Sequence, residues 1–407
     1  MRARATAGLS VFIVALLLCG CAGSPISKAL QLGKPRSLPT FSNEAVPRGF
    51  VGVVRRCTGK GRFPTPPCFD VLALFSTTNG IEQRTLVRYP LQQQQQSDVG
   101  NVGISYPSRG PRGDVWFLLT EPLCRSELYR MDAGTGHVVL VAKRCGFVLS
   151  SPVQSPNGRF LAYVLFSGDL NANALIIRDL ATGREREVLP VDSHGRAGGR
   201  PESVLPVRGT PSFNDGGGPG PSDAPSPDSF VTGVAWSLDS SRVAVRHVAG
   251  EEARLCGPPN SCYLYPDRSL DVFDVASLKR LTNIHGQGRC QIQSSAFDSA
   301  GLVIAQTCDL HDSDASVVQY APDLRTQLSE TKLDKCALES SVVAGGAQHD
   351  AVLISAYDYC PKSAWPGKAP LKAIGPQQLI DVLQDGRLRS VLVYPNGGDG
   401  ELREVGW

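Results

Sequence analysis

A short internal repeat limits the folds open to this chain. Its first copy begins at residues 155–163 with SPNGRFLAY and continues at residues 175–183 with LIIRDLATG. A second copy begins at residues 235–245 with AWSLDSSRVAV and ends at residues 270–281 with LDVFDVASLKRL. Each copy has the pattern of strands separated by tight turns. A unit of this size cannot bury its apolar face alone, so the copies are expected to stack on one another.

Both copies resemble the repeat of TolB-like and WD40-like β-propellers, in which SPDG-r-l-A-f precedes l-w-v-x-D-l-x-t-G. Asn157 stands where the family pattern has Asp, and Leu238 and Ser240 replace the Pro and Gly of the second copy. The resemblance implies an all-β fold, a single β-propeller, and it transfers no specific activity.

The same spacing extends beyond the two copies and predicts about six four-stranded blades, with seven as the alternative. The second blade is expected over residues 115–141, the fifth over 292–320 and the last over 351–393. Strands such as 160–166 are apolar almost throughout, as expected where neighbouring blades cover both faces. Residues 190–228 are rich in Gly and Pro and predict a disordered insertion between blades.

The first blade lacks a strand of its own. Its expected strands lie at residues 50–54, 71–75 and 84–89, and the C-terminal residues 402–407 can supply the missing one. This pairing would close the ring and remove an exposed strand edge. The alternative is a frayed C-terminal tail.

The N-terminus predicts export and a lipid anchor. Arg2 and Arg4 precede an apolar run at residues 9–18, which has the length of a signal-peptide core and is too short to span a bilayer. The sequence LCGC at residues 18–21 resembles the bacterial lipobox, which implies that Cys21 receives a diacylglyceryl group and becomes the new N-terminus. The alternative is an ordinary cleaved signal with an incidental cysteine.

The expected organisation is a lipoprotein signal peptide at 1–20, a flexible tether from lipidated Cys21 at 21–48, and the propeller at 49–407. A flexible tether of that length reaches roughly 30 Å, so the propeller is expected near the extracytoplasmic face of the cell membrane. No other segment has 18 consecutive apolar residues, so no transmembrane helix is predicted.

The cysteines predict a disulfide framework. Of the twelve, Cys19 is removed with the signal and Cys21 is lipidated, which leaves an even number in an exported chain. Antiparallel partners lie at equal distances from their turn, which pairs Cys124 with Cys145, Cys290 with Cys308 and Cys336 with Cys360. The remaining cysteines then pair with their nearest neighbours, each pair closing a loop. The predicted pairs are Cys57–Cys68, Cys124–Cys145, Cys256–Cys262, Cys290–Cys308 and Cys336–Cys360. The rival, a zinc site, lacks CxxC and interleaved histidines.

The sequence carries no local motif for catalysis. G-x-S-x-G and Gly-rich phosphate loops are absent, so no catalytic or cofactor-binding residue is predicted. The acidic stretch DLHDSD at residues 309–314 lacks the Gly and the closing Glu of a calcium loop and is interpreted as solvated, so no metal ligand is predicted. The histidines are interpreted as exposed loop residues: His137, His194, His247, His285, His311 and His349.

The function expected from these features is binding without catalysis. The net charge of +3 gives no reason to expect nucleic acid. The chain is expected to be a monomeric, membrane-anchored scaffold that binds an envelope protein or ligand across one face, by analogy with the fold. Residues 22–48 are too short for the α/β domain of a full Tol-system protein, and the chain also resembles propeller lipoproteins that assist sensor kinases in actinobacteria. The alternative is a hydrolase, lyase or lactonase whose site lies in the central channel and leaves no local motif.

Overall fold

The structure is a computed structural model. It describes residues 39–42, 44–57, 68–91, 103–121, 125–145, 147–167, 173–188, 229–257, 261–286, 290–308, 314–333, 337–344, 351–358, 377–384, 387–395 and 400–406. All described strands belong to one compact unit, residues 37–200 and 225–407. Within the described residues every regular element is a β-strand, and the strands form six antiparallel sheets.

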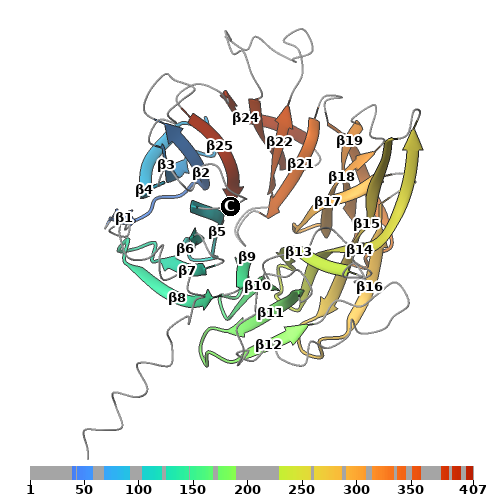
Figure 1. Cartoon of the computed structure of the whole chain (residues 1–407), viewed down its shortest axis with the longest axis horizontal. Coiled ribbons are helices and arrows are strands. Elements are labelled where there is room, and N and C mark those ends of the chain that lie inside the picture. The colour runs from blue at the N-terminus through green and yellow to red at the C-terminus, as the bar shows by residue number, and fades with distance from the viewer. Residues whose placement is uncertain are drawn as a thin grey trace, which may run out of the picture. The chain divides into compact units, whose positions relative to one another are not determined.

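The first three sheets contain the N-terminal half of the chain and its last strand (Figure 1). The first has the order β1-β4-β3-β2-β25: β1 (Thr40–Phe41), β4 (Glu82–Pro90), β3 (Cys68–Phe75), β2 (Phe50–Cys57) and β25 (Gly400–Gly406). The second is β5 (Gly103–Arg109), β6 (Val115–Glu121), β7 (Arg125–Met131) and β8 (Val138–Cys145). The third is β9 (Phe147–Gln154), β10 (Phe160–Ser167), β11 (Asn173–Asp179) and β12 (Glu185–Val188).

The other three sheets follow in chain order. The fourth is β13 (Ser229–Trp236), β14 (Arg242–Gly257), β15 (Ser261–Asp274) and β16 (Arg280–His285). The fifth is β17 (Cys290–Phe297), β18 (Leu302–Cys308), β19 (Asp314–Tyr320) and β20 (Gln327–Lys332). The sixth is β21 (Ala337–Ala344), β22 (Ala351–Asp358), β23 (Gln377–Gln384) and β24 (Arg387–Pro395).

The six sheets are the blades of a β-propeller. One edge strand of each blade contacts the corresponding strand of the next blade, in the cycle β25, β5, β9, β13, β17, β21 and back to β25. These are therefore the innermost strands, and they surround the centre of the ring (Figure 1). The propeller predicted from the repeat is confirmed, with six blades.

The C-terminal strand closes the ring, as predicted. β25 is antiparallel to β2, in a register that runs from Val51 opposite Gly406 to Arg56 opposite Gly400. Leu402 is fully buried in a cluster that contains residues of the first and sixth blades. Gly406 lies so close to β5 that a Cβ atom there would be 1.9 Å from the Pro107 carbonyl oxygen.

The repeat owes its turns to side chains that bind the backbone. In the first copy Ser155 Oγ accepts the Phe160 N–H at 2.9 Å, and Asn157 Oδ1 accepts the Arg159 N–H at 2.9 Å. In the second copy Ser237 Oγ accepts the Arg242 N–H at 2.9 Å. Asn157 therefore uses the same kind of oxygen as the Asp of the family pattern, which explains why the turn tolerates the exchange.

A second set of turns, between the third and fourth strands of the second to fifth blades, is capped by the aspartates Asp132, Asp179, Asp274 and Asp323. Asp179 Oδ1 accepts the N–H groups of Ala181 and Thr182, both at 3.0 Å. Asp323 accepts the N–H groups of Thr326 and Arg325, which lowers the pKa of its carboxyl to about 2. Such caps satisfy backbone donors that the tight turn would otherwise leave to water.

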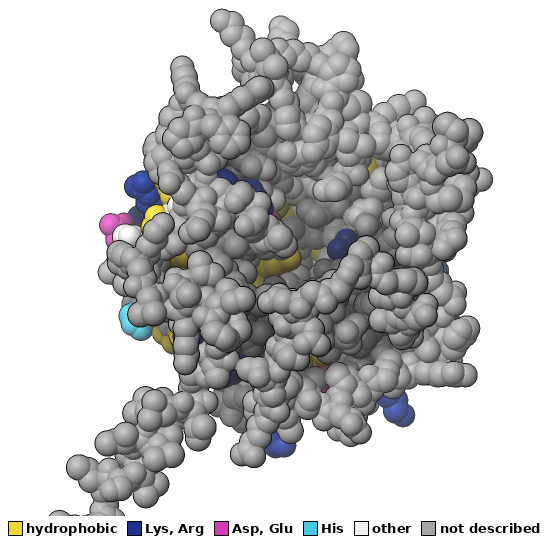
Figure 2. All heavy atoms as spheres, in the orientation of Figure 1, with side chains coloured by type: hydrophobic (Ala, Val, Ile, Leu, Met, Phe, Trp, Pro, Cys, Tyr) yellow, Lys and Arg dark blue, Asp and Glu magenta, His cyan; other side chains and the backbone are white. Residues whose placement is uncertain are grey.

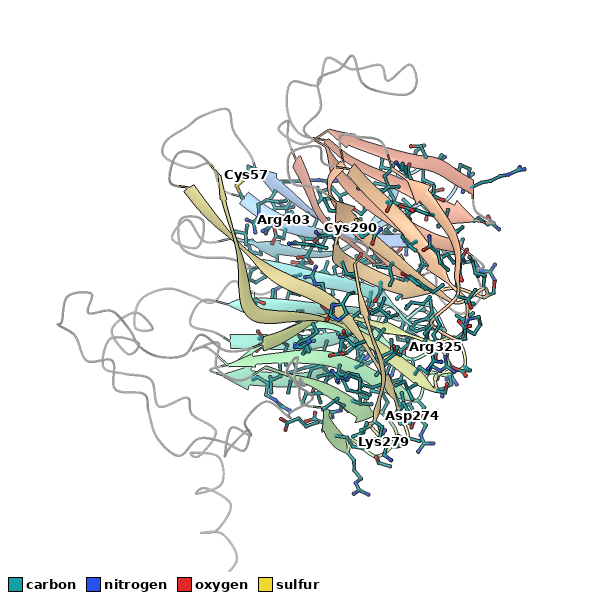
Figure 3. All side chains as sticks on the ribbon, turned by 90° about the vertical axis from the view of Figure 1, so that its right-hand side faces the viewer. Cys57, Asp274, Lys279, Cys290, Arg325 and Arg403 are labelled. Atoms are coloured by element: carbon teal, nitrogen blue, oxygen red, sulfur yellow. A yellow bond between two sulfur atoms is a disulfide. The ribbon has the colours of Figure 1, made fainter. Side chains whose placement is uncertain are left out.

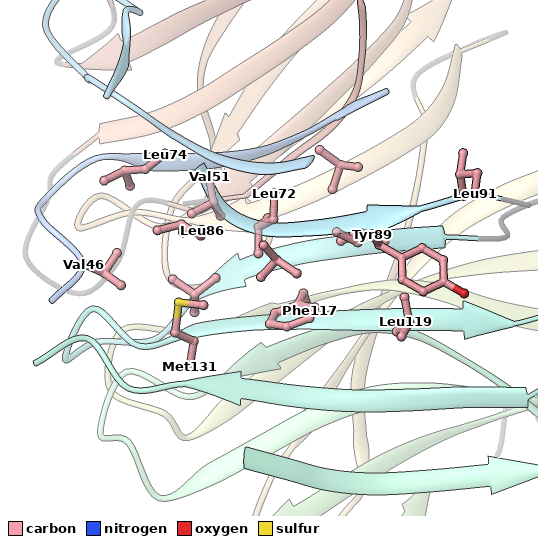
Figure 4. Packing of buried hydrophobic residues seen from close by; sticks show 14 of the residues in the cluster. Val46, Val51, Leu72, Leu74, Leu86, Tyr89, Leu91, Phe117, Leu119 and Met131 are labelled. Carbon is pink, nitrogen blue, oxygen red and sulfur yellow. The ribbon is translucent and has the colours of Figure 1, made fainter. Parts of the chain in front are cut away.

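The core consists of apolar layers between successive blades. The layer between the first and second blades includes Leu72, Leu86 and Phe117, all almost inaccessible to solvent (Figure 4). Polar contacts join blades as well, because Trp236 Nε1 donates to the Val153 carbonyl at 2.9 Å. The blades are therefore held by packing together with specific inter-blade hydrogen bonds.

The last residues of the expected tether, from residue 40 onward, already pair with and pack on the propeller. β1 pairs with β4, Val46 is buried, and Arg109 Nη1 donates to the carbonyls of Pro47 and Gly49 at 2.9 and 2.8 Å. The expected tether over 21–48 is therefore too long at its C-terminal end, because Arg109 and the apolar layer hold its last residues on the first two blades. Burial lowers the pKa of Arg109 to about 10, and Asp114 opposes the change.

Other expectations fall on residues that are not described. The signal peptide at 1–20, Cys21 and the insertion at 190–228 lie outside the described residues. The part of the chain that is described includes no helix with the length and hydropathy needed to span a membrane.

Candidate functional site

Each innermost strand carries a β-bulge. In every blade the register between the innermost strand and its neighbour shifts by one residue. The residues inserted by these shifts are Arg403 on β25, Tyr106 and Pro107 on β5, Ser151 and Pro152 on β9, Gly233 on β13, Gln293 on β17 and Leu338 on β21. Bulges often turn a side chain toward a site, so this ring of bulges, here called the bulge ring, is the candidate site.

The bulge ring lines a channel at the centre of the propeller. Its members Tyr106, Ser151, Gly233 and Gln293 are partly exposed, although neighbouring blades flank them. A Cβ atom at Gly233 would have no other atom within 4 Å, so this position faces open space. Figure 2 shows a hollow at the centre of the propeller, with hydrophobic side chains and a Lys or Arg side chain visible inside it.

The backbone at the bulge ring is unusual. Tyr106, Ser151 and Gly233 have φ of 49°, 48° and 63°. Positive φ is uncommon for residues other than glycine, and it clusters at functional sites where the surrounding structure enforces it. Three neighbouring blades therefore have a positive φ at the bulge of their innermost strands, and this conformation is strained at Tyr106 and Ser151 and permitted at Gly233.

Glu404 and Tyr106 meet across the junction of the first and second blades. A Glu404 Oε2 atom accepts the Tyr106 N–H. Burial raises the pKa of Glu404, the Tyr106 N–H and Arg403 oppose the rise, and Asp70 adds to it. Burial also raises the pKa of Tyr106 to about 12, with Glu404 adding to the rise and Arg246 opposing it. The phenol therefore stays neutral near pH 7 and can donate a hydrogen bond.

An ion pair between Arg55 and Asp70, half-buried at Arg55, acts electrostatically on Glu404 through Asp70. Arg55 Nε and Nη2 donate to Asp70 Oδ1 and Oδ2 at 2.8 and 3.2 Å, and Asp70 is fully buried. The Ile104 N–H of the second blade also donates to Asp70 Oδ2, at 3.2 Å. Gly103 permits this approach, because a Cβ atom there would be 1.9 Å from Asp70 Oδ2. The bidentate pair therefore lies within the first blade, and the Ile104 N–H bond to Asp70 joins it to the second blade.

Arg246 approaches the channel from the fourth blade. It lies on β14 opposite Thr232, next to the bulge at Gly233, and Nη1 donates to the Gln293 carbonyl of the fifth blade. From the fourth blade Arg246 opposes the rise in the pKa of Tyr106 in the second blade. Residues of four blades therefore converge on the bulge ring, although they are far apart in sequence.

One histidine departs from the expected exposed loops. His247 lies within β14 and is buried, with Nδ1 3.4 Å from Asp271 Oδ2. Asn283 Nδ2 donates to Asp271 Oδ1 at 2.8 Å and to Ser269 Oγ at 2.9 Å. The interpretation of His247 as an exposed loop residue was wrong, because it is part of a polar cluster inside the fourth blade. His137 and His285 are exposed, and His194, His311 and His349 lie outside the described residues.

The described cysteines lie at one end of the blades, where the second strand ends. Cys57 and Cys68 form a disulfide, as predicted (Figure 3). Cys256 is directly opposite Cys262, and Cys290, which is disulfide-bonded, is directly opposite Cys308. The pairing of Cys124 with Cys145 and of Cys336 with Cys360 includes residues outside the described ones, so these pairs stay predictions.

Metal ligands were not predicted from sequence. In the described part of the chain no three His, Cys, Asp or Glu residues are arranged to hold a metal ion. The acidic stretch at 309–314 lies outside the described residues except for Asp314, the first residue of β19.

No protein-family model matches the chain, and no curated protein does. Solved structures with a similar fold include a putative TolB from Agrobacterium tumefaciens, at 13% identity and a TM-score of 0.44, covering 85% of this chain and 90% of that chain. TolB from Acinetobacter baumannii is 16% identical with a TM-score of 0.47, and the match covers 89% of this chain and 68% of that chain. The β-propeller domain of the Trilobed protease from Pyrococcus furiosus is 11% identical with a TM-score of 0.39, covering 71% of both chains. These similarities concern the fold alone.

Proposed function

We propose that this chain is a lipid-anchored protein of the cell envelope whose propeller binds an envelope protein at the central channel without catalysing a reaction. The observation that carries the proposal is the bulge ring, which brings Tyr106, Arg246 and Glu404 from three blades to one partly exposed place. Tyr and Arg are enriched among residues that dominate binding energy. Rigid strands hold these side chains, which lowers the entropy lost on binding.

Two features support an extracytoplasmic location with a lipid anchor. The N-terminal sequence ends its apolar run at LCGC, with Cys21 as the acceptor. The disulfide Cys57–Cys68 suits an oxidising compartment. An anchor with two or more acyl chains holds a protein stably at a membrane, whereas a single chain is marginal.

The anchor is tested on the protein expressed with its own signal. The wild type is expected to enter the detergent phase and to carry the mass of a diacylglyceryl group on Cys21, while Cys21→Ser stays in the aqueous phase. Recovery of the wild type in the aqueous phase without lipid mass would remove the anchor from the proposal.

The partner is tested by crosslinking in intact cells, followed by mass spectrometry of the purified lipidated protein. One envelope protein is expected in replicate experiments, and its yield is expected to fall with Arg246→Gln. The matched control is Arg325→Gln, at an exposed turn away from the bulge ring. An equal yield from both variants and the wild type would contradict binding at the channel.

The competing candidate is a channel enzyme, and Glu404 is the residue that favours it. Its pKa is raised by burial and further by the Asp70 carboxylate, which is the arrangement of a general acid beside a second carboxylate. A panel of chromogenic esters, lactones and glycosides tests it. Turnover that is lost in Glu404→Gln and kept in Glu82→Gln would favour the enzyme over the binding protein.

A further inference from the structure

We infer that the outer rim of the first and second blades lies on the membrane surface, with apolar side chains of β8 among the lipid headgroups and Arg88 beside anionic lipid. The occupant of this rim is the bilayer, and not a second protein. The inference rests on the proposed function for the lipid anchor. It deepens that function, because it states which side of the propeller meets the membrane.

The apolar stretch of β8 is the first support. β8 is the outermost strand of the second blade, and it begins with an unbroken apolar run, VVLV at Val138–Val141. Val139 and Leu140 are 48% and 47% exposed. Exposed edge strands usually carry charged residues that discourage contact. An exposed apolar run on such a strand therefore marks a contact surface.

The outermost strands of the next three blades differ from β8. β12 has the charged sequence EREV. β16 and β20 have one exposed leucine each, Leu281 and Leu328, which are both 50% exposed and stand among polar residues. Within the described parts of the chain, β8 is the strand with two adjacent exposed large apolar side chains. The surface is therefore local to one side of the ring.

The place where the tether joins the propeller is the second support. β1 pairs with the outer edge of β4, directly after the expected tether. The Phe41 ring lies 6.1 Å from the Tyr129 ring, and Leu140 is directly opposite Tyr129 on the next strand. Figure 1 shows β1 at the outer rim, between β4 and β8. The chain that leads from the anchor therefore reaches the propeller beside the apolar stretch.

The length of the tether makes a weak contact sufficient. A flexible chain over residues 22–38 reaches roughly 20–25 Å from Cys21. A tether of this kind gives the propeller an effective concentration at the membrane of about a millimolar. A patch that binds lipid weakly is then occupied for much of the time. The rim beside β1 is the part of the propeller that the anchor holds closest to the bilayer.

The charges beside the stretch are the third support. Arg88 is exposed on β4, directly opposite Thr40. Its guanidinium lies 3.9 Å from the centre of the Phe69 ring, an uncharged neighbour. The exposed carboxylate of Glu44 is paired with Arg84 at 3.0 Å. Basic residues beside an apolar strip are typical of surfaces that bind anionic lipid.

Docking by the rim is compatible with binding at the channel. The bulge ring surrounds the centre of the propeller, whereas β1, β4 and β8 lie at the outer edge of their blades. The two surfaces are therefore separate. An envelope protein can occupy the channel while β8 rests on lipid.

The test uses the purified lipidated chain in vesicles of phosphatidylcholine and phosphatidylglycerol, with a photoreactive amino acid at Leu140. Mass spectrometry measures the yield of phospholipid adduct. The matched control carries the same amino acid at Leu328, which is equally exposed on the outermost strand of the fifth blade. The yield from Leu140 is expected to exceed that from Leu328 about tenfold or more, because the tether holds one strand at the bilayer and leaves the other in water.

The part of the inference that concerns charge has its own variant. Arg88→Gln is expected to lower the Leu140 yield in these vesicles, because an anionic membrane surface attracts the arginine. In vesicles of phosphatidylcholine alone the same variant is expected to match the wild type. An unchanged yield from Arg88→Gln in the anionic vesicles would overturn the role of Arg88.

Two results would overturn docking itself. Equal lipid yields from Leu140 and Leu328 would show that no side of the propeller prefers the membrane. An adduct of Leu140 with a protein in place of lipid, in intact cells, would make the stretch a protein interface. If the Leu140 variant fails to fold, as judged by its melting curve, Val139 takes its place with the same expected results.

Docking and anchoring can fail separately. If Cys21 carries no lipid, a chain of residues 22–407 with an N-terminal histidine tag is held on nickel-chelating lipid in the same vesicles. The tag supplies a tether at the same point of the chain. A preference of Leu140 over Leu328 in that experiment would support the rim even without the natural anchor, and equal yields would overturn it.

Discussion

Leu402→Ala tests how much the C-terminal strand contributes to the closed ring. Leu402 is fully buried on β25, in a cluster with Phe50 and Phe75 of the first blade and Leu353 and Ile380 of the sixth. Removing a buried leucine side chain of this kind costs about 2–5 kcal/mol, so a loss of about 3 kcal/mol is expected. Domains are stable by only about 5–15 kcal/mol, so this loss is a large share of the total and lowers the ratio of folded to unfolded protein about a hundredfold.

The assay is equilibrium unfolding in guanidinium chloride, with the free energy extrapolated to water. The control is Leu328→Ala on β20, because Leu328 is 50% exposed and its truncation is expected to change stability by less than about 0.5 kcal/mol. Removal of residues 402–407 is expected to destabilise at least as much as Leu402→Ala. Equal free energies of unfolding for Leu402→Ala and the wild type would show that closure by β25 does not stabilise the ring. An equal loss of unfolding free energy in Leu402→Ala and Leu328→Ala would show the same.

Three further predictions concern the rest of the fold. Replacing Cys57 and Cys68 together by serine is expected to lower the unfolding free energy by about 3 kcal/mol, since the bridge closes a loop with a sequence separation of 11; an unchanged denaturation midpoint would contradict this. Trp236→Phe is expected to cost about 2 kcal/mol, through the lost hydrogen bond to Val153 and the lost ring volume, and calorimetry that finds no change in melting temperature would count against it. The pKa of Asp323 is lowered from 3.8 to about 2, so its contribution to stability is present above pH 4 and is lost as the pH falls toward 2. The stability difference between wild type and Asp323→Asn is therefore expected at pH 7 and should vanish near pH 2, and a difference that persists there would refute the assignment.

The fold could be predicted where a short stretch of sequence determines the local structure. The SPNG turn at residues 155–158 and the turn that follows Asp179 use side chains a few residues from the backbone groups they bind, so a short stretch of sequence reveals them. The closing strand was predictable for a different reason. The first blade lacked a strand, and the C-terminal residues had the pattern to supply it.

Some strands were not recognised in the sequence. β5, β20 and β21 were missing from the expected blades. β5 contains the bulge at Tyr106 and Pro107, which interrupts the alternation of buried and exposed residues that identifies a strand. β14 and β15 are 16 and 14 residues long, far beyond the short strands expected in the second copy of the repeat.

The candidate site was not predictable as a set of residues. Tyr106, Arg246 and Glu404 are separated by more than a hundred residues from one another, and each is ordinary in its local sequence. They come together only because six innermost strands surround one axis and each is bulged. The burial of His247 was missed for a similar reason, since its partner Asp271 lies on the next strand and only the strand register brings them close.

A photoreactive amino acid placed in intact cells at Ser151 tests the central claim most directly. Ser151 belongs to the bulge ring, and Val139, on the outer strand β8 and 48% exposed, serves as the rim control. The account predicts an adduct with an envelope protein from Ser151 and none from Val139. An adduct from Val139 with none from Ser151 would contradict binding at the channel.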